Sequence, residues 1–148
     1  MAVAAHVSRV SKEYAPHGFS VMESATACGT LPAGGTAAMY IPIVHADDAD
    51  IYLESVTFLA VQGHGSEGTN YWDITLVSGP LGLASESAVS STGIGGASTA
   101  ITLNATTAFT LTTNVISVGN GLYLKCDPNH ASSAQKAFGA VARYRRKA

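Results

Sequence analysis

Apolar and polar residues alternate along two segments of the chain, Tyr71–Val77 (YWDITLV) and Gly121–Cys126 (GLYLKC). In the first segment, Trp72, Ile74 and Leu76 share one side, and polar residues stand between them. Successive side chains of a β-strand point to opposite faces of its sheet. The period of two therefore predicts strands that have one buried apolar face and one polar face.

The rest of the chain predicts short strands that are separated by turns rich in glycine, proline and asparagine. Ala84–Val89 is compatible with a helical turn, and Asp127–Asn129 is expected to end a strand. Gly119–Gly121 predicts a tight hairpin turn between two strands, because Asn and Gly accept a positive φ at low cost. The expected strands are residues 19–28, 36–44, 51–62, 71–78, 100–103, 109–118, 122–126 and 136–146. This pattern predicts an all-β fold, a single β-sandwich of jelly-roll or immunoglobulin-like type, whose strand order the sequence leaves open.

The segment Ile51–Gln62 departs from simple alternation, because apolar residues occupy both odd and even positions along it. Three explanations fit. The strand is buried on both faces, it changes register at a β-bulge near Glu54–Ser55, or a second subunit covers one of its faces. On the third explanation, Tyr52, Val56 and Phe58 are candidate contact residues.

The length of 148 residues fits one domain, which we divide into an N-terminal arm (1–18) and a β-sandwich domain (19–148). The arm carries Val3, Val7 and Val10 among small and polar residues, which makes it too apolar for a free tail. We expect it to be extended and to contact a neighbouring surface; a short first strand of the same domain is the alternative.

Charged residues make up 12% of the chain, about half of the usual ~25%. So little charge favours a protein that covers much of its surface in an assembly, against the alternative of a neutral monomer. The formal net charge of −2 argues against general affinity for nucleic acid or anionic membranes. Half of the Lys and Arg residues gather at the end of the chain, where Arg143 and Arg145 share one face of a strand. They fit an acidic protein surface; a merely solubilising end is the alternative.

Candidate catalytic and metal-binding groups are sparse. The five histidines are scattered, no serine lies in a nucleophile motif, and Asp47, Asp48, Asp50 and Glu54 read better as a hydrated acidic turn than as a calcium loop. The two cysteines, Cys28 and Cys126, lie in separate strand segments and favour buried free thiols over a bridge. We therefore expect no enzymatic activity, no cofactor and no metal.

The chain also lacks the sequence marks of export or membrane insertion. Met1–His6 has no basic region followed by a long apolar core, as a signal peptide would, and no apolar run approaches the ~20 residues of a membrane helix. The expectation is a protein made and used without secretion, with no membrane partner.

Two segments resemble small structural proteins of tailed bacteriophages, in particular capsid decoration (cement) proteins and related head-fibre or tail β-sandwich modules. The first is Ile51–Leu76, a strand, a Gly-rich loop and a Tyr-Trp strand. The second is GNGLYL at Gly119–Leu124 followed by VARYRR at Val141–Arg146. The resemblance implies a homo-oligomeric β-sandwich, often a trimer, that clamps neighbouring capsid subunits through an N-terminal arm or loops. The stretch 84–107, rich in Ala, Ser, Thr and Gly, departs from that pattern.

The favoured hypothesis is a non-enzymatic virion protein that binds the assembled capsid and stabilises it by bridging neighbouring subunits. Its partners would be the major capsid protein or other virion subunits, and it would be made in the host cytoplasm and found on the capsid surface. The expected contact residues are Val3, Val7, Val10, Tyr52, Val56, Phe58, Arg143 and Arg145. The alternative is a carbohydrate- or receptor-binding module, which would expose Tyr71, Trp72 and Tyr123 as an aromatic platform.

Overall fold

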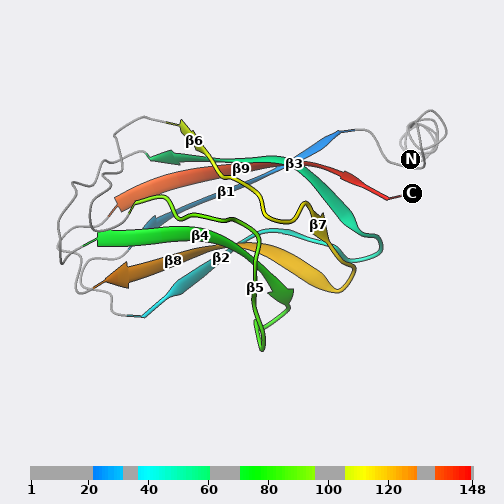
Figure 1. The fold of residues 1–148 in the computed structure, drawn as a ribbon, viewed down its shortest axis with the longest axis horizontal. Helices are drawn as coiled ribbons and strands as arrows, with labels where there is room; N and C mark the ends of the chain where they lie inside the picture. The colour runs from blue at the N-terminus through cyan, green and yellow to red at the C-terminus, as the bar shows by residue number, and fades with distance from the viewer. Residues whose placement is uncertain (1–21, 32–36, 61–70, 96–105, 130–135, 148) are drawn as a thin grey trace, which may run out of the picture.

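A computed structural model describes residues 22–31, 37–60, 71–95, 106–129 and 136–147. The proposed arm (1–18) and the expected strand 100–103 lie outside the described residues. The described chain forms nine strands (Figure 1). They are β1 (Glu23–Leu31), β2 (Met39–His45), β3 (Ile51–Ala60), β4 (Tyr71–Pro80), β5 (Ser87–Ala88), β6 (Thr106–Ala108), β7 (Val115–Ile116), β8 (Asn120–Asn129) and β9 (Lys136–Arg146).

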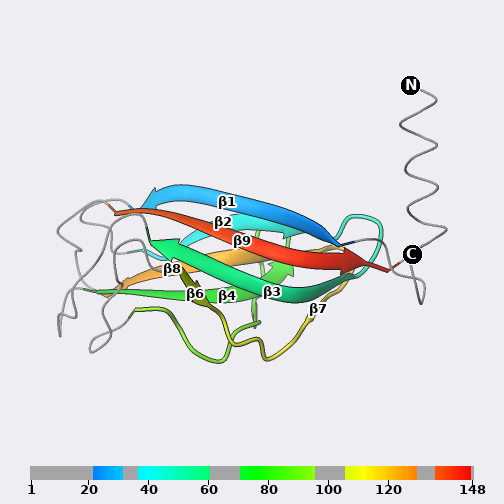
Figure 2. The ribbon, with the colours of Figure 1, turned by 90° about the horizontal axis from the view of Figure 1, so that it is seen from above.

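The strands form two antiparallel sheets that pack face to face, so the predicted β-sandwich is confirmed (Figures 1 and 2). One sheet has the order β1-β9-β3-β6, with β7 also paired to β3, and the other has the order β2-β8-β4-β5. Strands β1 to β4 alternate between the sheets. The last two strands are inserted among them: β9 lies between β1 and β3, and β8 lies between β2 and β4.

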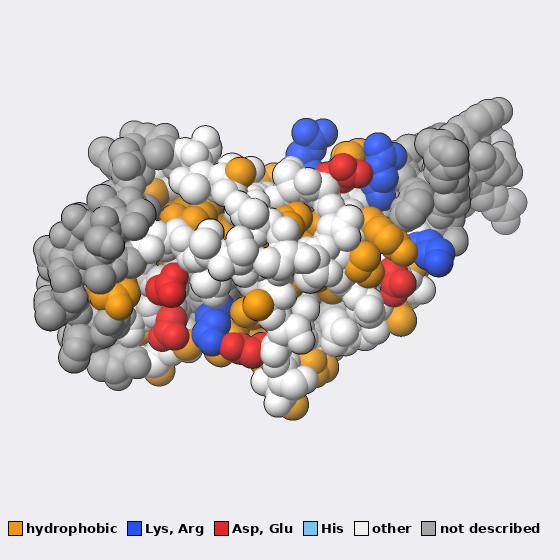
Figure 3. Space-filling view, in the orientation of Figure 1, with side chains coloured by type: hydrophobic (Ala, Val, Ile, Leu, Met, Phe, Trp, Pro, Cys, Tyr) orange, Lys and Arg blue, Asp and Glu red, His pale blue; other side chains and the backbone are white. Residues whose placement is uncertain are grey.

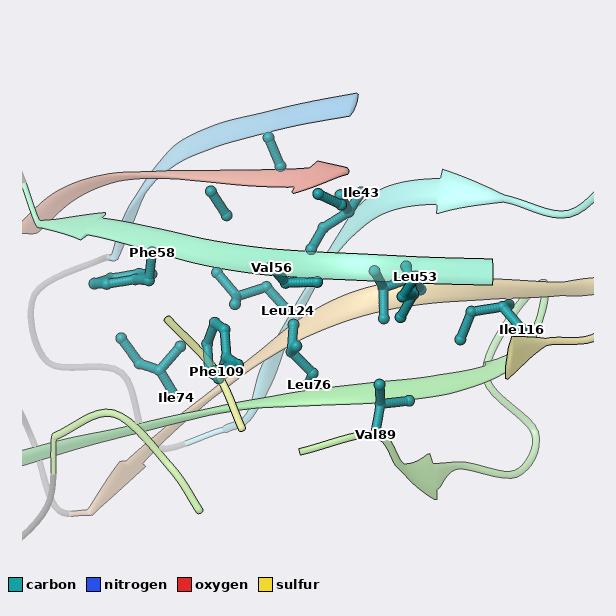
Figure 4. Packing of buried hydrophobic residues seen from close by; sticks show 14 of the residues in the cluster. Ile43, Leu53, Val56, Phe58, Ile74, Leu76, Val89, Phe109, Ile116 and Leu124 are labelled. Atoms are coloured by element: carbon teal, nitrogen blue, oxygen red, sulfur yellow. The ribbon is translucent and has the colours of Figure 1, made fainter. Parts of the chain in front are cut away.

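The core lies between the two sheets and contains the apolar sides of the alternating strands (Figure 4). Ile74 and Leu76 of β4 are fully buried, and so is Leu124 of β8. Burial of such aliphatic side chains contributes roughly 1.5–3 kcal/mol each relative to exposure. The alternation therefore identified the interior face of both strands correctly.

A β-bulge explains the irregular pattern of β3. Leu53 pairs with Tyr144 and Ser55 pairs with Arg143, so Glu54 has no residue opposite it in the register of β9. Odd positions face the core before the bulge and even positions face it afterwards. The bulge, one of the three explanations offered by the sequence, is therefore correct: the strand has one buried face, which changes parity at Glu54.

The expected strand 109–118 is wrong. Within these residues the structure has only the two-residue strand β7 and a single bridge between Leu111 and Ser90. β6 ends before them, at Ala108, and both β6 and β7 pair with β3. The turn before β8 exists, with Asn120 N–H donating to the Ser117 carbonyl at 3.0 Å and Gly119 at a φ of 87°. However, it leads from one sheet to the other, so the predicted hairpin is also wrong. The reason is that both edges of β8 are already taken, by β2 and β4.

The other boundaries differ by smaller amounts. β9 covers the expected residues 136–146, whereas β8 continues to Asn129 and carries Pro128 opposite Trp72. The expected helical turn 84–89 is wrong, because this segment forms the short strand β5 against β4. Val89 is fully buried and donates its N–H to the Leu76 carbonyl at 2.9 Å, which holds the segment extended.

The two sheets are joined by hydrogen bonds along one side of the sandwich. Thr112 N–H donates to the Val89 carbonyl at 2.8 Å, and Ser91 N–H donates to the Thr110 carbonyl at 3.0 Å. These bonds connect the chain after β5 with the chain after β6. On the opposite side, β1 and β2 are the outermost strands of their sheets (Figure 2).

Candidate functional site

The outer face of the β1-β9-β3 sheet, which we call the plain face, carries few charged side chains. In register across the three strands, Thr26 lies beside Val141, which lies beside Thr57. Val141 is 41% exposed and Leu59, one row further along β3, is 39% exposed. Figure 3 looks at another side of the sandwich, with β4 in front as in Figure 1, and there the Lys, Arg, Asp and Glu side chains gather in a few small groups. Small, uncharged side chains on a sheet face cost little to desolvate, which suits a contact surface.

The basic residues at the end of β9 are largely neutralised within the chain. Arg145 Nε lies 3.4 Å from a carboxylate oxygen of Glu54, and Arg146 reaches Glu23 at 3.5 Å and Asp48 at 3.6 Å. Arg143 is exposed on the plain face, and no carboxylate of the described residues forms a salt bridge with it. Of the two arginines that the sequence singled out, Arg143 is therefore the one without a salt bridge among the described residues.

The three candidate contact residues of β3 have different positions. Val56 (0% exposed) and Phe58 (2% exposed) lie in the core of the sandwich, and Phe58 stacks on Phe138 with a centroid distance of 5.8 Å. They therefore fill this chain's own interior rather than a surface that a second subunit would cover. Tyr52 is partly exposed and pairs in register with Arg145. Val3, Val7 and Val10 lie outside the described residues.

The acidic turn after β2 is used to hold the chain together. Asp50 Oδ1 accepts a hydrogen bond from the Val118 N–H at 2.9 Å, and Asp47 lies 2.6 Å from His45 Nδ1. No group of three or more His, Cys, Asp or Glu side chains in the described ranges has a geometry for a metal ion. Within the same ranges, no helix has the length and apolar character needed to cross a membrane.

The outer face of the other sheet carries a carboxylate pair that sequence reasoning missed. Asp73 of β4 lies directly opposite Asp127 of β8, beside a hollow of about 300 Å³ that Glu86 and Lys125 also line. Alternation did place Asp73 on the polar side of its strand. Asp127 was expected in a turn, and the register that brings the two together is long-range and not readable from the sequence.

Of the charged groups around this hollow, Glu86 and Lys125 form a salt bridge, whereas Asp73 faces a second carboxylate, Asp127. Lys125 Nζ lies 2.5 Å from a carboxylate oxygen of Glu86, and this hydrogen bond is the main cause that lowers the pKa of Glu86 and raises the pKa of Lys125. Tyr40 also hydrogen-bonds Glu86, which raises the pKa of the tyrosine. The pKa of Asp73 is raised, first by burial and then by the charge of Asp127.

We predict that Asp73→Asn stabilises the protein at neutral pH. Like charges directly opposite each other in a sheet cost roughly 0.2–1 kcal/mol, and the gain should be of this size. A raised pKa means that the folded state holds this proton more tightly than the unfolded chain does. The free energy of unfolding of the wild type therefore falls as the pH rises through the pKa of Asp73 in the folded protein. The advantage of Asp73→Asn should vanish as the pH falls below the usual pKa of an aspartate, where Asp73 is protonated in both the folded and the unfolded state.

Urea denaturation of the two proteins at a series of pH values measures this difference. The matched comparison adds Asp127→Asn and the double variant. If the two carboxylates repel each other, the double variant gains less than the sum of the single gains. Additive gains would show that the pair does not interact.

The aromatic platform of the alternative function is not formed. Trp72 is 1% exposed and Tyr123 is 7% exposed, so neither side chain offers a ring face to a sugar. The reason is that Trp72 occupies an inward position of β4. Only Tyr71 of the three is partly exposed.

The two cysteine thiols, Cys28 and Cys126, differ strongly in their exposure to solvent. Cys126 is fully buried, and burial raises the pKa of its thiol to about 12, so it stays protonated and unreactive at neutral pH. Cys28 is exposed on the plain face beside Gly139. Both are free, in agreement with the absence of a bridge predicted from the sequence, but only Cys126 is buried.

Comparison with known proteins finds likeness among solved structures but not among families or curated proteins. No protein-family model matches the chain, and no curated protein matches it. Among solved structures, a chain of the cyanophage Pam1 capsid asymmetric unit matches with a TM-score of 0.51 and 17% sequence identity. The match covers 89% of this chain and 89% of that chain. At this level of identity the likeness shows a shared fold over nearly the whole chain.

Proposed function

We propose that this protein is a non-enzymatic structural component of a bacteriophage virion, which binds the assembled capsid and stabilises it by bridging neighbouring subunits. The observation that carries the proposal is the structural likeness to a chain of a phage capsid asymmetric unit, which extends over 89% of both chains. The plain face and the low charge of 12% add support, because both suit a chain that works by contact.

The strand order supports assigning the sandwich to the jelly-roll type, which is frequent in viral capsid proteins. A jelly roll has eight strand positions in two sheets. Here β6 and β7 share one position beside β3, so the nine strands fill eight positions. The interleaving of β8 and β9 among the first four strands is typical of this arrangement and differs from the immunoglobulin order.

The mechanism requires no chemistry. A ligand that binds only the assembled shell shifts the equilibrium toward that shell, by about 2.7 kcal/mol per site when its free concentration is one hundred times its Kd. The major capsid protein or another virion subunit would be the partner, and the protein would act on the capsid surface after synthesis in the host cytoplasm. Arg143, Tyr52 and residues 1–18 are the proposed contact elements, because Val56 and Phe58 lie in the core and Arg145 is paired with Glu54. The resemblance favours a trimer as the oligomeric state.

The test mixes the purified protein with capsid shells that lack it and, separately, with unassembled capsid subunits. We expect it to co-sediment with shells, to raise the temperature at which they disrupt, and to ignore the free subunits. Arg143→Glu should weaken binding, while Arg143→Lys, which keeps the charge, should bind nearly as well as the wild type. A protein that leaves shells unbound and their disruption temperature unchanged would refute the proposal.

A further inference from the structure

The two sheets of the sandwich have four outer edges, and an unprotected edge is a template for pairing with another strand. Proteins protect such edges with very short strands, with proline, with β-bulges, with lysine, or by covering them with other chain. The four edges of this molecule can be compared on these terms.

Three of the edges are protected. β5 and the chain after it cover the edge of β4, and the chain around β6 and β7 covers the edge of β3. Both coverings consist of strands of two or three residues, and they hydrogen-bond to each other where the sheets are joined. The third edge, β2, contains the exposed Pro42, which has no N–H to donate, and a register shift between Pro42 and Val44.

The fourth edge, β1, has none of these features within the part of the chain that the structure describes. It is nine residues long (ESATACGTL), contains no proline or lysine, and pairs with β9 from Glu23 to Leu31 without a register shift. Between Ser24 and Thr30, no backbone hydrogen bond joins the side of β1 that faces away from β9 to any described residue. β1 lies at the rim of its layer, with no described strand beyond it (Figure 2).

We infer that β1 is an intersubunit pairing edge, and that its partner is the β1 strand of a second copy of this chain, aligned antiparallel about a two-fold axis. The pair would continue the β1-β9-β3 sheet from one copy into the next. The inference goes beyond the proposed function, because it names a contact between copies and does not depend on capsid binding.

The composition of β1 fits self-pairing. Its only charged residue is Glu23, at the first position, so an antiparallel pair places the two Glu23 side chains at opposite ends and keeps like charges apart. A parallel pair would place them side by side. The residues on the outer face, Ser24, Thr26, Cys28 and Thr30, are small, so facing rows come together without steric conflict.

A two-fold contact that every copy fills leaves an even number of copies in the particle. The expected solution mass of the wild-type protein at high concentration, with a reducing agent to keep Cys28 free, is that of a dimer. It is that of a hexamer if the trimer that the resemblance favours also forms, because the two-fold contact then joins two trimers. Thr26→Lys should halve this mass, because it places a lysine from each copy in the paired strands.

The matched control is Thr57→Lys. Thr26, Val141 and Thr57 lie in one row of the plain face, but Thr57 is on β3, two strands away from the edge. We expect Thr57→Lys to keep the wild-type mass. Hydrogen exchange adds a readout that needs no variant, since the amides of Ser24–Thr30 that face the edge should gain protection as the protein concentration rises.

Three results would overturn the inference. The first is a wild-type particle with an odd number of copies at every concentration. The second is equal masses for Thr26→Lys and the wild type, with circular dichroism showing both folded. The third is dissociation by both lysine variants, which would place the contact on the plain face instead of at the edge. Each leaves the capsid-binding assay unaffected, so failure here is distinguishable from failure of the proposed function.

Discussion

Replacing Phe58 with alanine is expected to lower the free energy of unfolding by about 3–5 kcal/mol, the usual cost of removing a large aromatic side chain from a core. Phe58 is 2% exposed, and its ring stacks on Phe138 at an interplanar angle of 13°. The change removes both the buried area and the stacking contact. Urea denaturation followed by circular dichroism measures the loss.

The matched control is the next residue, Leu59, which points to the opposite face of β3 and is 39% exposed. Leu59→Ala should change the unfolding free energy by only about 0.5 kcal/mol, as is usual for surface substitutions. Comparable losses for the two variants in the isolated protein would contradict the one-faced assignment of β3. Comparable losses would instead support a strand that is buried on both faces.

The contrast between Phe58 and Leu59 shows how far the sequence of β3 predicts which of its side chains are buried. Apolar residues at both parities were visible in the sequence, and a bulge at Glu54–Ser55 was one explanation among three. Choosing between the three requires the register of β9, which pairs Leu53 and Ser55 with consecutive residues and bypasses Glu54. That register joins residues about ninety positions apart in the chain, and local alternation carries no information about it.

The strands with strong alternation were predictable for a physical reason. β4 and β8 lie between other strands, with one face in the core, so every second residue must be apolar. The segments at the covered edge, β5, β6 and β7, pair over only two or three residues, and β5 and β6 expose all of their side chains. Such segments carry no periodic pattern, and the predictions of a helical turn and of one long strand failed there.

The candidate surfaces were predictable to a smaller extent. The sequence identified Arg143 as a positively charged residue on the outer face of its strand. It could not show that Arg145 forms a salt bridge with Glu54, or that Arg146 forms one with Glu23. The unprotected edge was also hidden. The strand that forms it was expected at residues 19–28, and only the strand order shows that it lies at the rim of its sheet.

Gly79→Ala is expected to cost about 2–3 kcal/mol of unfolding free energy, at the upper end of the usual range for overpacking. A Cβ at Gly79 would lie 2.3 Å from the carbonyl oxygen of Ser85 and 3.0 Å from a methyl group of Leu83. The carbonyl belongs to the backbone that follows the turn closed by the Leu83 N–H and the Pro80 carbonyl at 2.9 Å, so the whole turn must move to relieve the contact.

Gly139→Ala is the control for this substitution, because it makes the same change on β9, where a Cβ would meet nothing closer than the Ala27 carbonyl oxygen at 3.8 Å. Alanine in a strand interior avoids the entropy that glycine loses on folding, about 0.5–1 kcal/mol, so this variant should be as stable as the wild type or slightly more stable. Thermal and urea unfolding should therefore show a clear loss of stability for Gly79→Ala and no loss for Gly139→Ala. An unchanged Gly79→Ala, or equal losses for the two variants, would mean that the approach of Ser85 to β4 does not limit the space at Gly79.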